Sequence, residues 1–170
     1  NGSDFWVGVR GLGIINHLNS SGSNITGGFN ITSAGVGVIA EVFHNGTHLL
    51  VSDTEDRFIY VFNLSGSNMS SGFSVNPAGS DSAEALTSNG SNIFVLDTTD
   101  NRVYSFNASR SNVSGDFDAT ASGALTPKGL ATNGTHFFIT DESDDFMYVV
   151  NFSGSNTTLG TKLNLPDLNR

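Results

Sequence analysis

The feature that most constrains this chain is an internal repeat. The segments NGSDFWVGV, NGTHLLVSD, NGSNIFVLD and NGTHFFITD begin at Asn1, Asn45, Asn89 and Asn133, so they recur every 44 residues. A fixed period of this length is typical of repeat architectures, in which one unit cannot bury its apolar face without its neighbours. The 170 residues are therefore expected to form four copies of one supersecondary unit.

Each unit contains segments with the length and composition of β-strands. Apolar runs such as HLLVSD are followed by aromatic or β-branched runs such as FIYVFNL, and both are bounded by Gly, Asn, Asp or Ser. VIAEVFH, AEALTS and KGLAT suit an inner strand, whereas GGFNIT, SGFSVN, GDFDAT and GTKLNL suit an outer strand. No segment indicates a helix. Four antiparallel strands in about 44 residues describe the blade of a β-propeller.

One stretch carries a more specific resemblance. LTPKGLATNGTHFFITDESDDFMYVVNFSGS, from Leu125 to Ser155, resembles the NHL-type propeller repeat, which has a Pro-Gly-containing inner strand, a Gly turn and an apolar strand ending in Asp. The first unit departs from this pattern, because Val9 replaces the Asp of the other units and Asn16 replaces their Tyr. The family includes enzymes, adhesive modules and scaffolds, so the resemblance implies a fold and leaves the function open.

The predicted fold is all-β, a single four-bladed β-propeller domain over residues 1–170. Its four-stranded antiparallel blades are expected at about 1–36, 37–80, 81–124 and 125–170. The first blade lacks an inner strand of its own, and LPDLNR at the C terminus resembles the start of one. We expect a C-terminal strand to complete that blade, because an unfilled position leaves an open edge. A strand from the same molecule would close the ring, whereas a neighbour's strand would build a chain of subunits.

Composition excludes several classes of function. Seven Lys plus Arg residues against 16 Asp plus Glu give a net charge of −9, and no basic patch is present, so nucleic acid is not an expected partner. No apolar run reaches the roughly 18 residues that a membrane span needs. The absence of Cys excludes disulfides and thiolate metal sites. Without an initiator Met, the chain is interpreted as a mature or excerpted product.

Asn-x-Ser/Thr triplets, the acceptor sequence for N-linked glycans, begin at 13 of the 19 Asn residues. They are Asn1, Asn19, Asn24, Asn30, Asn45, Asn63, Asn68, Asn89, Asn107, Asn112, Asn133, Asn151 and Asn156. All except Asn30 fall into three columns with the 44-residue spacing. A structural explanation is that Asn-Gly suits a type I′ turn and that duplication copies it. Such a turn has no evident use for the hydroxyl two residues later, so the sequence predicts N-glycosylation and a secretory route.

The up-and-down path of a blade predicts where these triplets lie. The turns between strands one and two and between strands three and four share one face, so glycans are expected on that face, with Asn30 the outlier. The turn between strands two and three lies on the other face and carries the acids Asp53, Glu55, Asp56, Asp97, Asp100, Asp141, Glu142, Asp144 and Asp145. Calcium is one interpretation, with Asp53, Asp97 and Asp141 as candidate ligands. The favoured interpretation is no metal, with Asp capping tight turns.

Catalytic candidates are few, and no enzymatic activity is predicted. Glu41 and Glu84 are the acids expected on inner strands near a channel. His48 and His136 follow predicted glycan acceptors and are expected to be exposed. His17 lies on the third strand of the first blade, where its side chain is expected either to point outward or to line a pocket. The recurring Phe29, Phe73 and Phe117 and the recurring Tyr60, Tyr104 and Tyr148 are expected to pack one blade against the next, with the Tyr hydroxyls bonded to backbone. Sugar stacking on the Tyr column is the alternative.

Three functional hypotheses follow. The first is a secreted, heavily N-glycosylated structural protein that self-associates into an extracellular fibre, coat or appendage. The second is an extracellular binding propeller whose acidic face takes a protein, glycan or calcium ligand. The third is a propeller hydrolase or lyase. No cofactor is expected beyond the covalent N-linked glycans, and the expected location is extracellular or at the cell surface.

Overall fold

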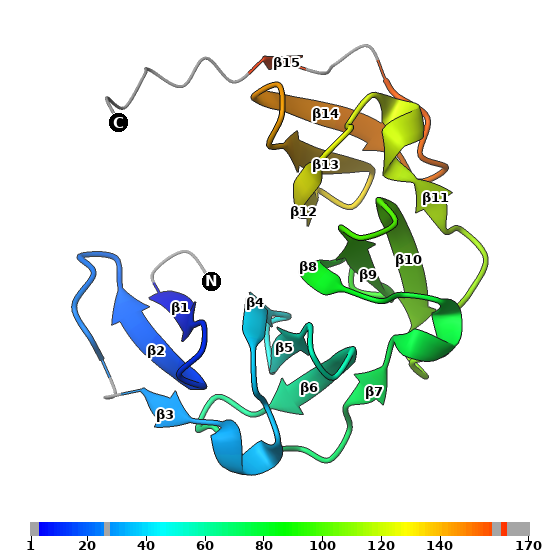
Figure 1. Cartoon of the computed structure of the whole chain (residues 1–170). Helices are drawn as coiled ribbons and strands as arrows, with labels where there is room; N and C mark the ends of the chain where they lie inside the picture. Colours follow the sequence, from blue (N-terminus) through cyan, green and yellow to red (C-terminus); the bar gives the residue numbers. More distant parts are fainter. Residues whose placement is uncertain (1–3, 26–27, 158–160, 163–170) are drawn as a thin grey trace. The chain divides into compact units, whose positions relative to one another are not determined.

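Four antiparallel sheets of consecutive strands make up the computed structural model, which describes residues 4–25, 28–157 and 161–162 (Figure 1). Sheet 1 contains β1 (Asp4–Val9), β2 (Ile14–Asn19) and β3 (Phe29–Asn30). Sheet 2 contains β4 (Ile39–His44), β5 (Leu49–Asp53), β6 (Phe58–Phe62) and β7 (Phe73–Ser74). Sheet 3 contains β8 (Ala83–Ser88), β9 (Asn92–Asp97), β10 (Arg102–Asn107) and β11 (Phe117–Asp118). Sheet 4 contains β12 (Pro127–Thr132), β13 (His136–Asp141), β14 (Phe146–Asn151) and β15 (Thr161–Lys162). The all-β class is confirmed.

The outer strands are followed by short helical turns that the sequence pattern did not predict. Single 3₁₀ turns form at η1 (Thr32–Ala34), η2 (Asn76–Ala78) and η3 (Ala119–Ser122). Each ends at a Gly with positive φ, 99° at Gly35, 98° at Gly79 and 106° at Gly123. Glycine adopts this left-handed conformation without steric cost, so the chain reverses sharply from an outer strand toward the next inner strand. The expectation that no helix forms is wrong for these three turns.

The chain divides into two compact units, Asn1–Leu86 and Thr87–Arg170. In the first unit, a core of Ile15, Ile31, Val36, Ile39, Leu49, Val51 and Phe62 is fully or almost fully buried. Trp6, Phe29, Val42 and Tyr60 pack against that core. Apolar residues of two sheets thus bury one another, as the repeat predicts for units that cannot fold alone. Among the described residues, no helix has the length and apolar character to cross a bilayer.

The Phe column packs one sheet against the next through a glycine. In the first unit, a Cβ added to Gly66 would lie 2.4 Å from the ring of Phe29, and in the second unit a Cβ on Gly154 would lie 2.5 Å from the ring of Phe117. Such distances leave no room for a side chain, so each ring lies directly on the backbone of the glycine turn. The sheet-to-sheet role that the sequence assigned to this column agrees with these two contacts.

The column of turn positions that contains Gly66 and Gly154 has one member that is not glycine, and this leads to a stability prediction. Gly22, Gly66 and Gly154 have φ of 78°, 85° and 77°, whereas Arg110 occupies the equivalent position with φ 61°. A left-handed conformation costs a non-glycine residue about 1–2 kcal/mol. Replacement by glycine removes this cost, but the greater freedom of glycine in the unfolded chain offsets part of the gain in stability. Arg110→Gly is expected to raise the free energy of unfolding by about 0.5–1 kcal/mol in urea denaturation.

The control for Arg110→Gly is Gly154→Ala. Because the added methyl group would collide with the Phe117 ring, this substitution is expected to lower the unfolding midpoint. A lower midpoint for Arg110→Gly would contradict the prediction, since it would mean that the arginine side chain stabilises the turn more than its φ destabilises it.

Candidate functional site

The strand register places the predicted glycan acceptors at one end of each sheet. In sheet 2, His44 pairs with Leu49 and Leu49 pairs with Phe62, so the end of β4, the start of β5 and the end of β6 lie together. Asn45 and Asn63 follow directly at this end, which we call the sequon end. Ile39, Asp53 and Phe58 pair at the opposite end, which we call the acid end.

The three columns occupy three successive places at the sequon end. The first column lies in the turn between the first two strands of sheets 2, 3 and 4, at Asn45, Asn89 and Asn133. The second column, Asn19, Asn63, Asn107 and Asn151, lies at the ends of β2, β10 and β14 and directly after β6. The third column, Asn24, Asn68, Asn112 and Asn156, pairs with that strand through isolated bridges. Asn30 pairs with Ile14 at the acid end, where the sequence placed its outlier. Asn1 lies outside the described residues, as do Thr26 and Thr158, which complete two of the triplets.

In the first column, the amide oxygen of Asn holds the turn. Asn45 Oδ1 accepts hydrogen bonds from the Thr47 nitrogen (3.1 Å), the Thr47 hydroxyl (3.2 Å) and the His48 nitrogen (2.8 Å). Asn133 has the same three contacts with Thr135 and His136. The Nδ2 groups of Asn45 and Asn133 have no hydrogen-bond acceptor among the described residues, and both residues are exposed. The nitrogen that a glycan would modify is therefore free.

The second column repeats this arrangement in a wider turn. Asn63 Oδ1 accepts from the Ser65 nitrogen (3.0 Å), the Ser65 hydroxyl (2.8 Å) and the Ser67 nitrogen (2.9 Å). Asn19 and Asn151 make the equivalent contacts. In these turns and in those of Asn30, Asn45 and Asn133, the hydroxyl of the triplet donates to the Asn oxygen. The interpretation that such turns have no use for the hydroxyl is therefore wrong.

The third column is not uniform. Asn68 uses Oδ1 to accept from the Ser70 nitrogen (2.9 Å), and its Nδ2 has no acceptor in the described part of the chain. Asn112 Nδ2 donates to the Ser105 carbonyl and to the Asp116 carboxylate, whereas Asn156 Nδ2 donates to the Ser122 carbonyl (2.8 Å). The repeat pattern predicted the same role for these residues, but in the structure their amide nitrogens make different contacts.

At the acid end, the column Asp residues are buried and do not belong to an exposed face. Asp53 and Asp97 are 0% exposed and Asp141 is 5% exposed. Asp53 Oδ2 accepts from the nitrogens of Gly37 (2.6 Å) and Val38, and Oδ1 accepts from those of Glu55 and Asp56. The Asp53 carboxylate thus joins the segment that precedes β4 to the tight turn between β5 and β6. The predicted turn-capping role is present, and the structure adds that these Asp residues are buried.

Asp141 is held in the same way and has a depressed pKa. Burial by itself raises the pKa of Asp141, but hydrogen bonds from Ser143 and Thr126 outweigh burial and lower that pKa below its ordinary value. Within the described residues, no group of three or more His, Cys, Asp or Glu side chains could hold a metal ion. The carboxylates of Asp53, Asp97 and Asp141 all accept from N–H or O–H donors.

The Tyr column bonds to carboxylates, not to backbone as the sequence suggested. Tyr60 donates to Asp56 (2.9 Å) and Tyr148 donates to Asp144 (2.6 Å). Burial and the hydrogen bond to Asp56 raise the pKa of Tyr60 to about 12. The hydrogen bond to Asp144, together with burial, raises the pKa of Tyr148 to about 12. These hydroxyls therefore stay protonated and act as donors that fix the acidic turn.

Glu41 and Glu84, the predicted channel acids, lie on inner strands and are partly buried. Glu41 Oε2 accepts a hydrogen bond from the Leu86 nitrogen (2.9 Å), and Glu84 forms an ion pair with Arg10 (3.4 Å). Burial, opposed by the Leu86 bond and aided by the charge of Glu84, raises the pKa of Glu41 to about 7. A buried acid of this pKa is suited to exchanging a proton near neutrality, which is the arrangement that a general acid or base needs.

The four histidines do not come together as a catalytic set. His17 stacks on Trp6 with ring centroids 3.9 Å apart, and its Nε2 lies 3.3 Å from Asp4 Oδ2. His44 has a buried Nε2 without a partner in the described part of the chain, and burial lowers the pKa of His44. His48 and His136 contact the Thr hydroxyls of their neighbouring sequon turns at 2.9 and 3.0 Å. Sequence reasoning did not find the Trp6–His17 stack, although the two residues face each other in register.

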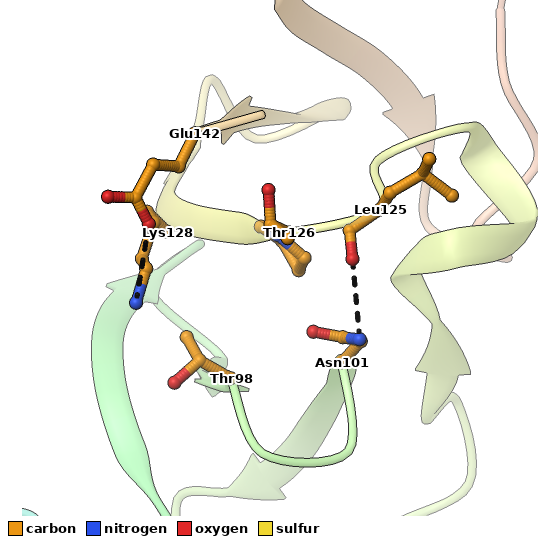
Figure 2. Close-up of a pocket in the computed structure, with 7 residues that line it drawn as sticks. Thr98, Asn101, Leu125, Thr126, Lys128 and Glu142 are labelled. Carbon is orange, nitrogen blue, oxygen red and sulfur yellow. Dashed lines mark hydrogen bonds and ion pairs between the residues drawn. The ribbon is translucent and has the colours of Figure 1, made fainter. Parts of the chain in front are cut away.

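A small pocket in the second unit is lined by polar side chains (Figure 2). Thr98 and Asn101 come from the turn between β9 and β10, and Leu125 to Lys128 and Glu142 complete the lining. Asn101 Nδ2 donates to the Leu125 carbonyl (3.5 Å), and Lys128 Nζ lies 3.8 Å from Glu142 Oε2. The volume is about 200 Å³, below the roughly 300–1,000 Å³ of typical ligand sites. The lining contains no His, Cys or paired acids.

Comparison with known proteins places the chain by its fold. No protein-family model matches the sequence, and no curated protein is similar to it in sequence. Among solved structures, virginiamycin B lyase from Staphylococcus aureus is similar with a TM-score of 0.65 and 12% identity, over 97% of this chain and 54% of that one.

Two further solved structures have a similar architecture. The Pan2 WD40 domain of Neurospora crassa matches with a TM-score of 0.64 and 11% identity, over 95% of this chain and 47% of that one. BamB from Moraxella catarrhalis matches with a TM-score of 0.55 and 16% identity, over 96% and 48%. This chain spans about half the length of the structures it matches. Identities this low carry no function across, so the comparisons show that the chain has the architecture of a β-propeller.

Proposed function

We propose that this chain is a secreted, heavily N-glycosylated structural β-propeller module, a building unit of an extracellular fibre, coat or appendage. The observation that carries the proposal is that the oxygen and the nitrogen of the Asn amide groups have separate roles at the sequon end. There the amide oxygens of Asn19, Asn45, Asn63, Asn133 and Asn151 hold turns, while their amide nitrogens have no described acceptor. An array of free amide nitrogens, each followed by the required hydroxyl, suits the attachment of N-linked sugars.

The finer architecture is also part of this proposal. The chain is proposed to form four NHL-like blades, the first completed by a C-terminal strand of the same molecule or of a neighbour; the segment that would supply it, residues 165–170, lies outside the described residues. Two observations support this. In the described part of the chain β1 is an edge strand of sheet 1, and Phe5 and Val7 on it are 57% and 42% exposed. An exposed apolar edge is a template for strand addition, and a neighbour's strand would join subunits.

A second candidate function is ligand binding at the acid end. Glu55 and Asp56 in the first unit, and Asp100, Glu142 and Asp145 in the second, are exposed at the acid ends of their own sheets, and of the described sequon residues Asn30 alone lies at such an end. A protein, glycan or calcium ligand would be recognised by this charge. The raised pKa of Glu41 supports, more weakly, a hydrolase or lyase activity. A rise in melting temperature on adding millimolar calcium would favour the binding function over the structural one.

The test of the structural function is electron microscopy of the native protein together with glycopeptide mass spectrometry. We expect filaments with the repeat of one propeller and sugars in each of the three Asn columns. Discrete particles with bare Asn residues would contradict the proposal.

Deleting residues 165–170 tests the strand that joins or closes the module. Because strand addition at β1 would lose its donor, we expect filaments to disappear while the far-ultraviolet circular dichroism of a β protein is retained. The matched control replaces Asp167 and Asn169 by Ser and keeps the strand length. Filaments that survive the deletion would show that subunits join elsewhere.

A further inference from the structure

The third sequon column contains one position where the fold uses the whole amide group. The 44-residue spacing aligns Asp116 with Gly28, Gly72 and Gly160, so a carboxylate in sheet 3 replaces a glycine of the other repeats. Asp116 lies four residues after Asn112, and its side chain turns back onto the strand that precedes both. No other repeat has a carboxylate at this place.

The resulting contacts occupy both hydrogens of the Asn112 amide. Nδ2 donates to the Ser105 carbonyl (3.3 Å) and to the Asp116 carboxylate (3.1 Å to Oδ2 and 3.3 Å to Oδ1). Asp116 Oδ1 also accepts from the Ser105 nitrogen at 2.7 Å. Ser105 on β10, Asn112 and Asp116 therefore form a closed set of hydrogen bonds, which we call the Asn112 clasp. A primary amide nitrogen carries two hydrogens, and both are committed.

N-glycosylation would break this clasp. The bond from sugar C1 to Nδ2 forms as the C1–O bond to the phosphate of a glycosyl donor breaks, and one Nδ2 hydrogen leaves as a proton. The product amide has a single N–H, so it cannot keep both the Ser105 and the Asp116 contact. A hydrogen bond to a carboxylate is among the stronger ones in a folded protein, so its loss opposes the modification.

We propose that the clasp withdraws Asn112 from glycosylation, whereas Asn68, the equivalent residue of sheet 2, is modified. This inference rests on the proposed glycosylation and makes it selective. Asn68 has Gly72 where Asn112 has Asp116, and its Nδ2 has no acceptor among the described residues. Asn156 is expected to have an intermediate occupancy, because its one described Nδ2 hydrogen bond, to the Ser122 carbonyl, leaves a second hydrogen that a sugar can replace. Selectivity of this kind requires that the sugar is added to the folded chain.

The first experiment measures site occupancy by glycopeptide mass spectrometry of the native protein. We expect the occupancy of Asn112 to be lower than that of Asn68 by at least about tenfold. In the variant Asp116→Gly, made in a host that glycosylates the chain, the occupancy of Asn112 should rise toward that of Asn68. Equal occupancy of the two residues in the native protein, with the other columns modified, would overturn the inference and leave the proposed function standing.

The second experiment tests the clasp without sugars, in the full chain from a host that adds none. Asn112→Ala is expected to lower the melting temperature by about 3–6 °C, and Asn68→Ala by less than about 1 °C. In the Asp116→Gly background, most of the effect of Asn112→Ala should vanish. Bare Asn residues throughout the native protein would overturn the proposed function, and equal effects of Asn112→Ala and Asn68→Ala would overturn the clasp.

Discussion

Replacing Asp53 by Ala is expected to lower the free energy of unfolding by about 3–5 kcal/mol. The carboxylate is fully buried and accepts from the backbone nitrogens of Gly37, Val38, Glu55 and Asp56. The alanine side chain leaves four donors without their acceptor and opens space beside them. Urea unfolding at pH 7, followed through the fluorescence of Trp6, measures the change.

Two variants give this prediction its controls. Glu55→Ala removes an exposed carboxylate from the same turn and should change stability by less than about 0.5 kcal/mol. Asp53→Asn keeps one acceptor oxygen but turns an NH₂ group toward two donors, so an intermediate loss is expected. A loss below about 1 kcal/mol for Asp53→Ala would mean that the turn is held by other contacts.

Glu41→Gln is expected to stabilise the protein by about 2–3 kcal/mol at pH 8 and to change little at pH 5. Burial raises the pKa of Glu41 from 4.5 to about 7. Between these values the folded state binds more protons than the unfolded state, so the stability of the native protein falls as pH rises. Glutamine has the same shape, carries no charge and can still accept from the Leu86 nitrogen, so it removes the cost of burying the carboxylate.

Urea midpoints of the two proteins from pH 4.5 to 8.5 test this expectation. The curves should meet near pH 5 and separate as Glu41 ionises. Glu55→Gln, at an exposed position, should follow the native curve throughout. Identical midpoints of Glu41→Gln and the native protein at pH 8 would show that the carboxylate is hydrated in the folded state.

The sequence predicted the strands well because their signals are local. The 44-residue spacing and the alternation of apolar runs with Gly, Asn and Asp turns place the described strands where Figure 1 shows them. The 3₁₀ turns were missed, although Gly35, Gly79 and Gly123 recur at the same spacing and could have indicated a sharp reversal. Each is too short to have a helical period, so periodicity analysis could not detect it.

The candidate site was predictable in outline and not in its hydrogen bonds. The order of strands in a blade is enough to put Asn45 and Asn63 at one end and Asp53 at the other. Whether an amide nitrogen is free depends on residues brought near by folding, such as Ser122, which lies 34 positions from Asn156. The burial of Asp53 was missed for the same reason, because its partners Gly37 and Val38 belong to the segment that precedes β4, 16 and 15 positions earlier in the chain.

In turns such as that of Asn63, the amide oxygen holds the turn and the amide nitrogen has no described partner, and this has a consequence for how such a chain can change over generations. The oxygen of Asn63 and the hydroxyl of Ser65 are fixed by the turn, so a mutation at either is selected against even where no sugar is attached. The Asn63 nitrogen makes no contact with the described residues of the turn, so under the proposed glycosylation a sugar there would be free to vary in size and chemistry. Under that proposal, a lineage could replace its carbohydrate by changing its transferases, while the protein kept its sequence.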